Sequence, residues 1–148
     1  MTSIREIVDP NGTLPSVVLL PYADQKSEFS GLRRIKMTIN MGEEVVGWCD
    51  IVLETSPSAY KAHFDGVKID KDKRGRGVGM ATYLQAIELA HDQGLPFETQ
   101  DYDQTVHAKT IWDKLAQLGV AEVITPFQPS KIKKGRFIGK YRVIAIND

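Results

Sequence analysis

The segment Ile69-Asp-Lys-Asp-Lys-Arg-Gly-Arg-Gly-Val-Gly-Met-Ala81 decides the fold of this chain. It joins an apolar strand to a long amphipathic helix through a cluster of basic residues and three glycines at alternate positions. Glycines in such a turn let the backbone bend tightly and let a ligand approach without a Cβ in the way. The first N–H groups of the helix have no partner within it, and the positive end of the helix dipole lies behind them. The segment therefore predicts a binding site for a phosphate group.

Composition points to one ordinary globular domain. The chain has 148 residues, which suits a single domain over 1–148, and 19 basic residues balance 19 acidic ones. The net charge therefore gives no argument for nucleic acid or an anionic membrane as a partner. No apolar run is long enough to span a bilayer and the first residues lack the core of a signal peptide, so we expect a cytoplasmic protein. The single cysteine, Cys49, excludes an internal disulfide and is predicted to be a buried thiol.

Strand and helix patterns alternate in an order typical of α/β domains. A short helix is expected over 3–8 and a long one over 77–93, followed by a second long helix over 105–118. Strands are expected over 16–20, 32–40, 44–54, 59–70, 95–100, 121–127 and 137–146. The order predicts one α/β domain with a mixed sheet, in which 32–40 and 44–54 form a hairpin.

The strand over 59–70 contains an irregularity of spacing. Its apolar side chains stand at even positions as far as Phe64 and at odd positions from Val67 onward. A strand cannot change face without an extra residue, so the pattern predicts a β-bulge at Asp65-Gly66. A bulge splays neighbouring strands and opens a slot for a ligand. The alternative is that the strand ends at Asp65.

Two common phosphate-binding patterns do not fit the glycine segment. A P-loop needs Gly-Lys-Ser/Thr, but Gly79 is followed by Met80-Ala81. The dinucleotide-binding pattern needs a third glycine where Met80 or Thr82 stands. The pattern that fits is Arg/Gln-x-x-Gly-x-Gly, beginning at Arg74, with an aliphatic residue five positions earlier.

On this motif and on the order of elements, the chain resembles the GNAT superfamily of N-acetyltransferases over about residues 32–146. Its compact form is similar to small members from bacteria and bacteriophages. The resemblance implies a mixed, mostly antiparallel sheet of the seven-strand type, with a splayed central parallel pair and flanking helices. It also implies acetyl-CoA as co-substrate without a metal, and transfer of the acetyl group to a primary amine.

The resemblance assigns the coenzyme to the glycine segment. Backbone groups of Ile69 and Lys71 would hold the pantetheine arm and the acetyl carbonyl, and the segment from Arg74 onward would hold the diphosphate. The residues assigned in this way are Ile69, Asp70, Lys71, Arg74, Gly75, Arg76, Gly77, Val78 and Gly79. The alternative for the basic side chains is a solvated loop.

Acetyl transfer to an amine needs a base, because an amine with a pKa of ~10.4 costs roughly 4–5 kcal/mol to deprotonate at neutral pH. His63 is the first candidate, since it lies eleven residues before Arg74, the spacing at which GNAT histone acetyltransferases carry their glutamate base. Glu98 is the second, because a carboxylate in a buried strand needs an explanation, and Asp65 is the third. The alternative for His63 is an ordinary polar residue on the outer face of its strand.

Two departures from the GNAT pattern concern the acid and the acceptor. Many GNAT enzymes carry on the second helix a tyrosine that reprotonates the thiolate, but that position holds Leu115 and Trp112 lies one turn earlier. Tyr102 and Tyr141 are possible substitutes, and core packing is the expected role of Trp112. Only Pro21 to Ser30 is available in place of two helices that usually wall the acceptor site. A reduced wall predicts an open cleft that suits an amine on a protein or peptide.

Two other functions are weighed against the enzyme. The first is a binding module of GNAT fold that docks on a partner protein and modulates it with little or no catalysis. The second is a nucleic-acid surface formed by 71–76 and 131–142, against which the zero net charge argues. The closing hairpin, 121–146, offers an edge for a homodimer.

Overall fold

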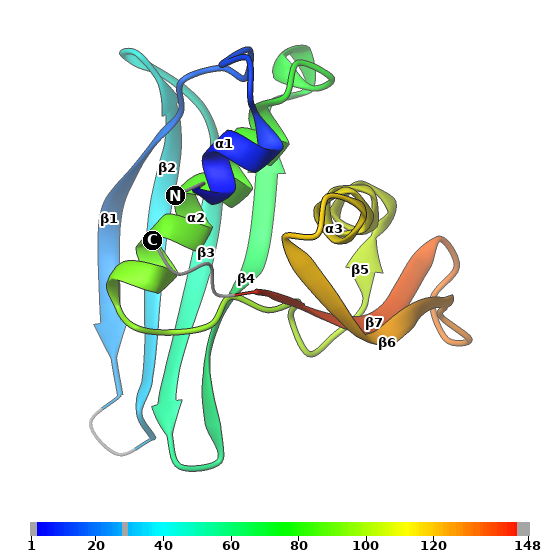
Figure 1. Ribbon diagram of the computed structural model, residues 1–148. Helices are drawn as coiled ribbons and strands as arrows, with labels where there is room; N and C mark the ends of the chain where they lie inside the picture. Colours follow the sequence, from blue (N-terminus) through cyan, green and yellow to red (C-terminus); the bar gives the residue numbers. More distant parts are fainter. Residues whose placement is uncertain (1–2, 28–29, 145–148) are drawn as a thin grey trace. The chain divides into compact units, whose positions relative to one another are not determined.

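The computed structural model describes residues 3–27 and 30–144 as two compact units (Figure 1). The four-stranded unit is Thr13–Phe97, and the three-stranded unit is Met1–Gly12 together with Glu98–Asp148. The predicted single domain over 1–148 stays a prediction. Among the described residues, no helix is both long and apolar enough to cross a membrane.

The four-stranded unit is built on an antiparallel meander. Its sheet has the order β1 (Val18–Lys26), β2 (Leu32–Met41), β3 (Glu44–Ser56) and β4 (Ala59–Ile69) (Figure 1). The predicted hairpin of β2 and β3 is confirmed. β1 is longer than the predicted 16–20 because the sheet accommodates Pro21 at a register shift, where an edge strand tolerates proline.

The bulge predicted in β4 is confirmed. Gly66 lies opposite Asp50 and Phe64 lies opposite Ile51, so Asp65 is the extra residue of the pair. The insertion keeps Phe64 and Val67 on the same face of the sheet although their positions differ by an odd number.

One face of this sheet forms the core. The helix α2 (Val78–Asp92) belongs to the same unit and buries its apolar side chains, among them Leu84 and Ile87. The rings of Phe64, Tyr83 and Phe97 meet edge to face, with centroids 4.9–6.2 Å apart. The buried side chains that share the face of Phe64 include Ile35, Met37, Ile39, Cys49, Ile51 and Leu53.

The opposite face, here called the polar face, is charged. Cross-strand partners point to the same side of a sheet, so this face carries Arg34, Lys36, Asp50, Glu54, Lys61 and His63. Among the described residues of Thr13–Phe97, α2 is the only α-helix, and it lies on the core side. The polar face therefore has no helix of its own unit to cover it.

The predicted strand over 95–100 is wrong as a continuous strand. This segment forms two isolated bridges, a parallel one between Ala62 and Phe97 and an antiparallel one between Glu98 and Arg142. The parallel bridge includes a hydrogen bond from the Ala62 N–H to the Pro96 carbonyl at 2.8 Å. In the described part of the chain, parallel pairing with β4 thus occurs only in the first half of β4.

The two sheets hold four and three strands. The predicted α/β arrangement of mainly antiparallel sheets with flanking helices is confirmed.

The three-stranded unit joins a helix to a hairpin. Its sheet has the order β5 (Gln104–Thr105), β7 (Arg136–Val143) and β6 (Ala121–Pro129). The helix α3 (Val106–Gln117) begins where the Thr105 hydroxyl accepts a hydrogen bond from the Ala108 N–H at 3.0 Å. It buries Ile111, Trp112 and Leu115 as predicted. A short helix, α1 (Ile4–Val8), also belongs to this unit, and the predicted end of the last strand, 145–146, lies outside the described residues.

Gly47 allows β3 and β4 to approach each other closely. A Cβ on Gly47 would stand 2.2 Å from the Lys68 carbonyl oxygen. We expect Gly47→Ala to lower the free energy of unfolding by about 1–3 kcal/mol, because the strands must separate. Chemical denaturation measures the loss. Gly66→Ala is the matched control, since its Cβ meets nothing within 4 Å, and equal stability of the two variants would contradict the prediction.

Candidate functional site

The connection from β4 to α2 is a turn built on left-handed glycines. A 3₁₀ turn, η1 (Lys71–Lys73), leads to Gly75 with φ of 77° and Gly77 with φ of 83°. Gly77 is the N-cap of α2 and offers no side chain to accept the first N–H groups. These groups lie at the positive end of the helix dipole and have no side-chain acceptor at the cap.

The two glycines are required for different reasons. At Gly75 a Cβ would meet nothing within 4 Å, so only the backbone conformation calls for glycine. At Gly77 a Cβ would also stand 2.8 Å from the Leu14 side chain. Gly77 thus packs against the segment before β1.

Four basic side chains surround the turn, and two of them are held in place. Lys73 forms an ion pair with Glu44 at 3.0 Å. The Arg74 Nε donates to the Ile69 carbonyl at 3.0 Å, which closes the loop between β4 and the glycines. Lys71 and Arg76 are exposed.

The edge of β4 turned away from β3 carries peptide groups that the ladder with β3 does not use. The Lys68 carbonyl faces Gly47 on β3, and the Asp70 N–H donates to the Val46 carbonyl on β3 at 2.8 Å. Peptide groups alternate in direction along a strand, so those of Ile69 and Val67 point to the other edge. Sequence reasoning named Ile69 and missed Val67, although the position of the bulge determines both.

His63 lies on the polar face but is buried, with 5% of its surface exposed. The distance from its Nδ1 to the Phe64 carbonyl oxygen is 3.1 Å. A carbonyl only accepts, so Nδ1 carries a proton, and in the neutral form of the ring the lone pair is on Nε2. Nε2 is buried and has no hydrogen-bond partner in the described structure. A nitrogen in this state can take up a proton.

The fold is similar to that of solved acetyltransferases. No protein-family profile matches the sequence, and no curated protein matches it. An acetyltransferase from Thermus thermophilus aligns with 88% of this chain and 97% of its own, at a TM-score of 0.54 and 16% identity. A Bacillus anthracis protein assigned as a streptothricin acetyltransferase, solved with acetyl coenzyme A, aligns with 92% of this chain and 93% of its own, at a TM-score of 0.50 and 12% identity.

The chain has the GNAT fold. β4 is bulged, the turn 70–77 follows it, and α2 begins at the glycines of this turn. All of these, together with His63, belong to the four-stranded unit.

The two carboxylates that were considered as bases besides His63 already have cationic partners. Asp65 accepts a hydrogen bond from the Arg34 guanidinium. Glu98, in the three-stranded unit, accepts from the Arg142 Nε at 3.0 Å and lies 3.5 Å from the Lys140 Nζ. The ion pairs of Glu98 give a structural reason for a buried carboxylate in this segment.

The aromatic residues considered as proton donors belong to the three-stranded unit. The Tyr141 hydroxyl donates to Asp113 at 2.7 Å, and burial together with that bond raises the pKa of Tyr141 to about 12. A phenol with so high a pKa is a weak proton donor. Tyr102 is exposed, and Trp112 packs edge-on against Tyr141 with centroids 6.3 Å apart, as expected for core packing.

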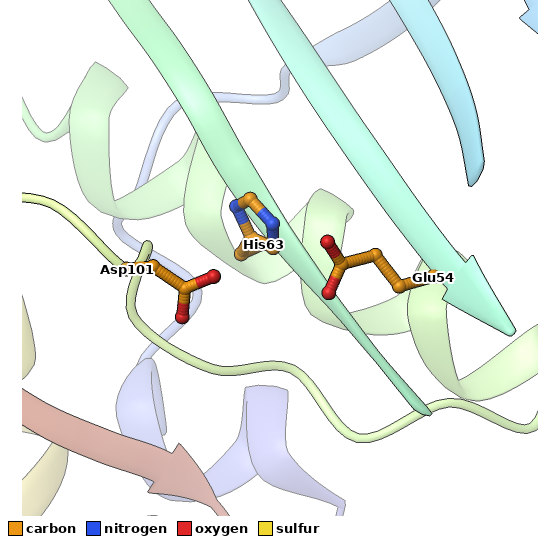
Figure 2. Close-up of side chains that lie close together, drawn as sticks. All are labelled: Glu54, His63 and Asp101. Atoms are coloured by element: carbon orange, nitrogen blue, oxygen red, sulfur yellow. The ribbon is translucent and has the colours of Figure 1, made fainter. Parts of the chain in front are cut away.

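Sequence reasoning also missed Glu54, a neighbour of His63 on the polar face. The two residues lie on adjacent strands, β3 and β4, and a Glu54 carboxylate oxygen is within 4.8 Å of a ring nitrogen of His63 (Figure 2). Asp101, also drawn there, belongs to the three-stranded unit. Glu54 Oε2 is buried and lacks a hydrogen-bond partner among the described residues. The sequence alone does not show that Glu54 lies beside His63, because this follows only from the bulge and the register between β3 and β4.

Cys49 gives a test of the core beneath this site. Burial, and then the charge of Asp50, raises the pKa of the Cys49 thiol from 9.0 to about 12. Above pH 9 the unfolded chain loses this proton while the folded chain keeps it, so the free energy of unfolding falls as the pH rises. The loss from this thiol is up to about 1.4 kcal/mol per pH unit.

We expect Cys49→Ala to weaken the alkaline loss of stability. Denaturation at pH 8 and at pH 10.5 measures it in the parent and the variant. The smaller alanine side chain lowers the free energy of unfolding equally at both pH values. Only the change in this free energy between pH 8 and pH 10.5 therefore reports the ionisation of the thiol. The same difference in both proteins would show that the thiol ionises normally.

Proposed function

We propose that this protein is an acetyl-CoA-dependent N-acetyltransferase that acetylates a primary amine on a protein or peptide. The observation that carries the proposal is the N-terminus of α2. Its glycine cap leaves the first N–H groups without a side-chain acceptor, directly after a bulged strand whose outer edge carries peptide groups that the ladder with β3 does not use. A diphosphate fits the first feature, and an extended pantetheine arm fits the second.

Acetyl-CoA would supply an acyl group activated as a thioester. In this proposal the backbone groups of Val67, Ile69 and Lys71 line the arm, and the loop that includes Asp70 positions them. The diphosphate is held by the turn and first helical residues, namely Arg74, Gly75, Arg76, Gly77, Val78 and Gly79. No metal is part of the proposed chemistry.

His63 is the base of the proposed reaction. Its Nε2 carries a lone pair that no protein donor occupies in the described structure. Taking one proton from an ammonium group at this atom leaves the amine nitrogen with the lone pair that an acyl acceptor needs. Glu98 stays the second candidate.

The acceptor class follows from what covers the polar face. Residues 21–26, which sequence reasoning left as the remnant of a helical wall, continue β1. Within its own unit the polar face around His63 is therefore bounded by strands and side chains alone. His63 on this face is itself buried, so the amine at the end of a long, narrow side chain of a protein or peptide suits the site better than a bulky metabolite.

The coenzyme site is tested by removing charge from the turn. We expect Arg74→Ala together with Arg76→Ala to weaken coenzyme A binding by about 10–100-fold, because a charged hydrogen bond contributes about 1.5–3 kcal/mol. Isothermal calorimetry measures the affinity. Gly77→Ala is a poorer test, since its Cβ would displace Leu14 and disturb the turn by itself.

Lys73→Ala is the matched control for this experiment, because that side chain is already paired with Glu44. It should change the affinity by less than about threefold. Pantetheine, which lacks the diphosphate, should bind the double variant and the parent equally. Parent-like affinity of the double variant for coenzyme A would place the diphosphate elsewhere.

The base is tested by replacing His63. We expect His63→Gln to lower kcat by about 10²–10⁴-fold at pH 7, because glutamine keeps polarity but cannot take up a proton. The affinity for coenzyme A should not change, since the side chain lies on β4 before the bulge. Initial rates and calorimetry on the same sample separate the two effects. If the variant turned over like the parent from pH 6 to pH 9, Glu98 would become the leading candidate.

A binding module is the second candidate function. The aromatic positions favour it, because α3 carries no tyrosine and the Tyr141 hydroxyl is committed to Asp113. Single-turnover acetylation of a peptide library, beside a coenzyme A titration, distinguishes the two functions. Binding of coenzyme A without acetyl transfer would support the module.

A further inference from the structure

Two buried hydrogen-bond acceptors belong to side chains that lie close together across the β3–β4 pair. They are the Nε2 of His63 and the Oε2 of Glu54, neither of which has a hydrogen-bond partner in the described residues. Figure 2 shows the Glu54 carboxylate turned toward the imidazole. A polar atom that is buried without a partner costs about 1–3 kcal/mol, so this arrangement calls for a ligand that donates to both.

We propose that Glu54 binds the ammonium group of the acceptor and presents one of its protons to His63. This rests on the proposed function, because it assigns a residue to the amine site of that reaction. It specifies that the acceptor enters as a charged primary amine and that Glu54 selects for the charge.

The chemistry of the two atoms determines what can lie between them. The His63 Nδ1–H donates to the Phe64 carbonyl, so Nε2 is an acceptor, and an ionised carboxylate only accepts. Two acceptors cannot bond to each other. The ligand must therefore bring at least two hydrogens on one atom, as a primary ammonium group does.

The spacing of the pair suits a tetrahedral nitrogen. Two acceptors that each lie about 2.9 Å from one ammonium nitrogen stand about 4.7 Å apart at the tetrahedral angle. One carboxylate oxygen of Glu54 and one ring nitrogen of His63 lie within 4.8 Å of each other, a limit that includes this spacing. The pair can thus bind one nitrogen from two sides while its third hydrogen and its carbon point away.

Charge favours an ammonium group over a neutral donor. The described structure records no ion pair for Glu54, whereas Asp24, Asp65 and Glu98 all have cationic partners. Lys61, opposite Glu54 in the register, has interactions of its own. Glu54 is half-buried with its Oε2 inaccessible to solvent, so a carboxylate without a cation is unfavourable there, and a bound ammonium group removes part of that cost.

The same geometry gives Glu54 a role after proton transfer. One N–H proton of the ammonium group passes to Nε2, which leaves a neutral amine and a protonated imidazole. The positive charge has then moved from the ligand to His63, still within reach of the Glu54 carboxylate. One carboxylate therefore stabilises the charge on both sides of the transfer.

The experiment compares two acceptors of nearly the same shape and different charge. n-Butylamine is an ammonium ion at pH 7 and resembles a lysine side chain, whereas O-propylhydroxylamine has an uncharged amino group. With saturating acetyl-CoA, we expect Glu54→Gln to raise KM for n-butylamine at least about tenfold, the effect of losing one charged hydrogen bond. KM for O-propylhydroxylamine should change by less than about threefold.

Glu43→Gln is the matched control, since this glutamate is exposed in the turn between β2 and β3. It should leave both KM values and the affinity for coenzyme A unchanged. An equal rise of KM for both acceptors in Glu54→Gln would show that Glu54 only supports the fold or the ring of His63. Unchanged kinetics with both acceptors would overturn the proposal as well.

A binding measurement decides the case in which neither acceptor is turned over. The ring signals of His63, assigned with His63→Gln, are followed by NMR during titration of the coenzyme A-bound protein with n-butylamine. A saturable shift in the parent that disappears in Glu54→Gln supports the proposal, and no shift in the parent overturns it.

Two further outcomes identify other causes. If chelation with EDTA abolished the shift and zinc restored it, the pair would bind a metal and the ammonium site would be wrong. Failure of the proposed function has a different result, namely no binding of coenzyme A and no acetylation of either compound.

Discussion

Successive peptide groups of a β-strand point to opposite edges, so one inserted residue changes which groups face which neighbour. In β4 that residue is Asp65. Before it, the Ala62 N–H points away from β3 and bonds to Pro96, and after it the groups of Val67 and Ile69 point the same way. The insertion therefore gives Val67 and Ile69 the same orientation as Ala62 and Phe64, with side chains on the face over α2 and peptide groups toward the outer edge. The Arg34 guanidinium, which binds the Asp65 carboxylate, ties the inserted residue to β2.

The turn after β4 depends on this edge. Arg74 closes the loop on the Ile69 carbonyl, and the loop then delivers the chain into α2 through Gly75 and Gly77. Because Gly77 packs on Leu14, the helix begins at a fixed place relative to the sheet. An unused strand edge and an uncapped helix start are each common in proteins. Their succession across one short, internally bonded loop makes this segment suitable for an extended ligand that ends in a diphosphate.

Features that depend on nearby residues were predictable from the sequence. The bulge follows from the change of parity between Phe64 and Val67, and the start of α2 follows from the glycine spacing. Features that depend on distant partners were not predictable. Glu98 was considered as a base because its burial was unexplained, and its partner Arg142 lies 44 positions away. The length of β1 was underestimated because Pro21 normally argues against a strand, and the register shift that admits it depends on β2.

The same distinction explains why only one of the two residues of the candidate site could be predicted from the sequence. His63 could be found by its distance from the glycine motif, which is a local count. Glu54 becomes its neighbour only through the pairing of β3 with β4, where the bulge shifts the register by one residue. Its carboxylate then adds an unpaired acceptor beside another one, which lowers stability and gives the fold no compensating contact in the described structure. Elsewhere the described chain pairs carboxylates that it buries, as Glu98 shows. Glu98 is neutralised by an arginine of the chain, whereas the half-buried Glu54 has no recorded ion pair in the described structure, and this contrast is what makes Glu54 suited to a cationic ligand.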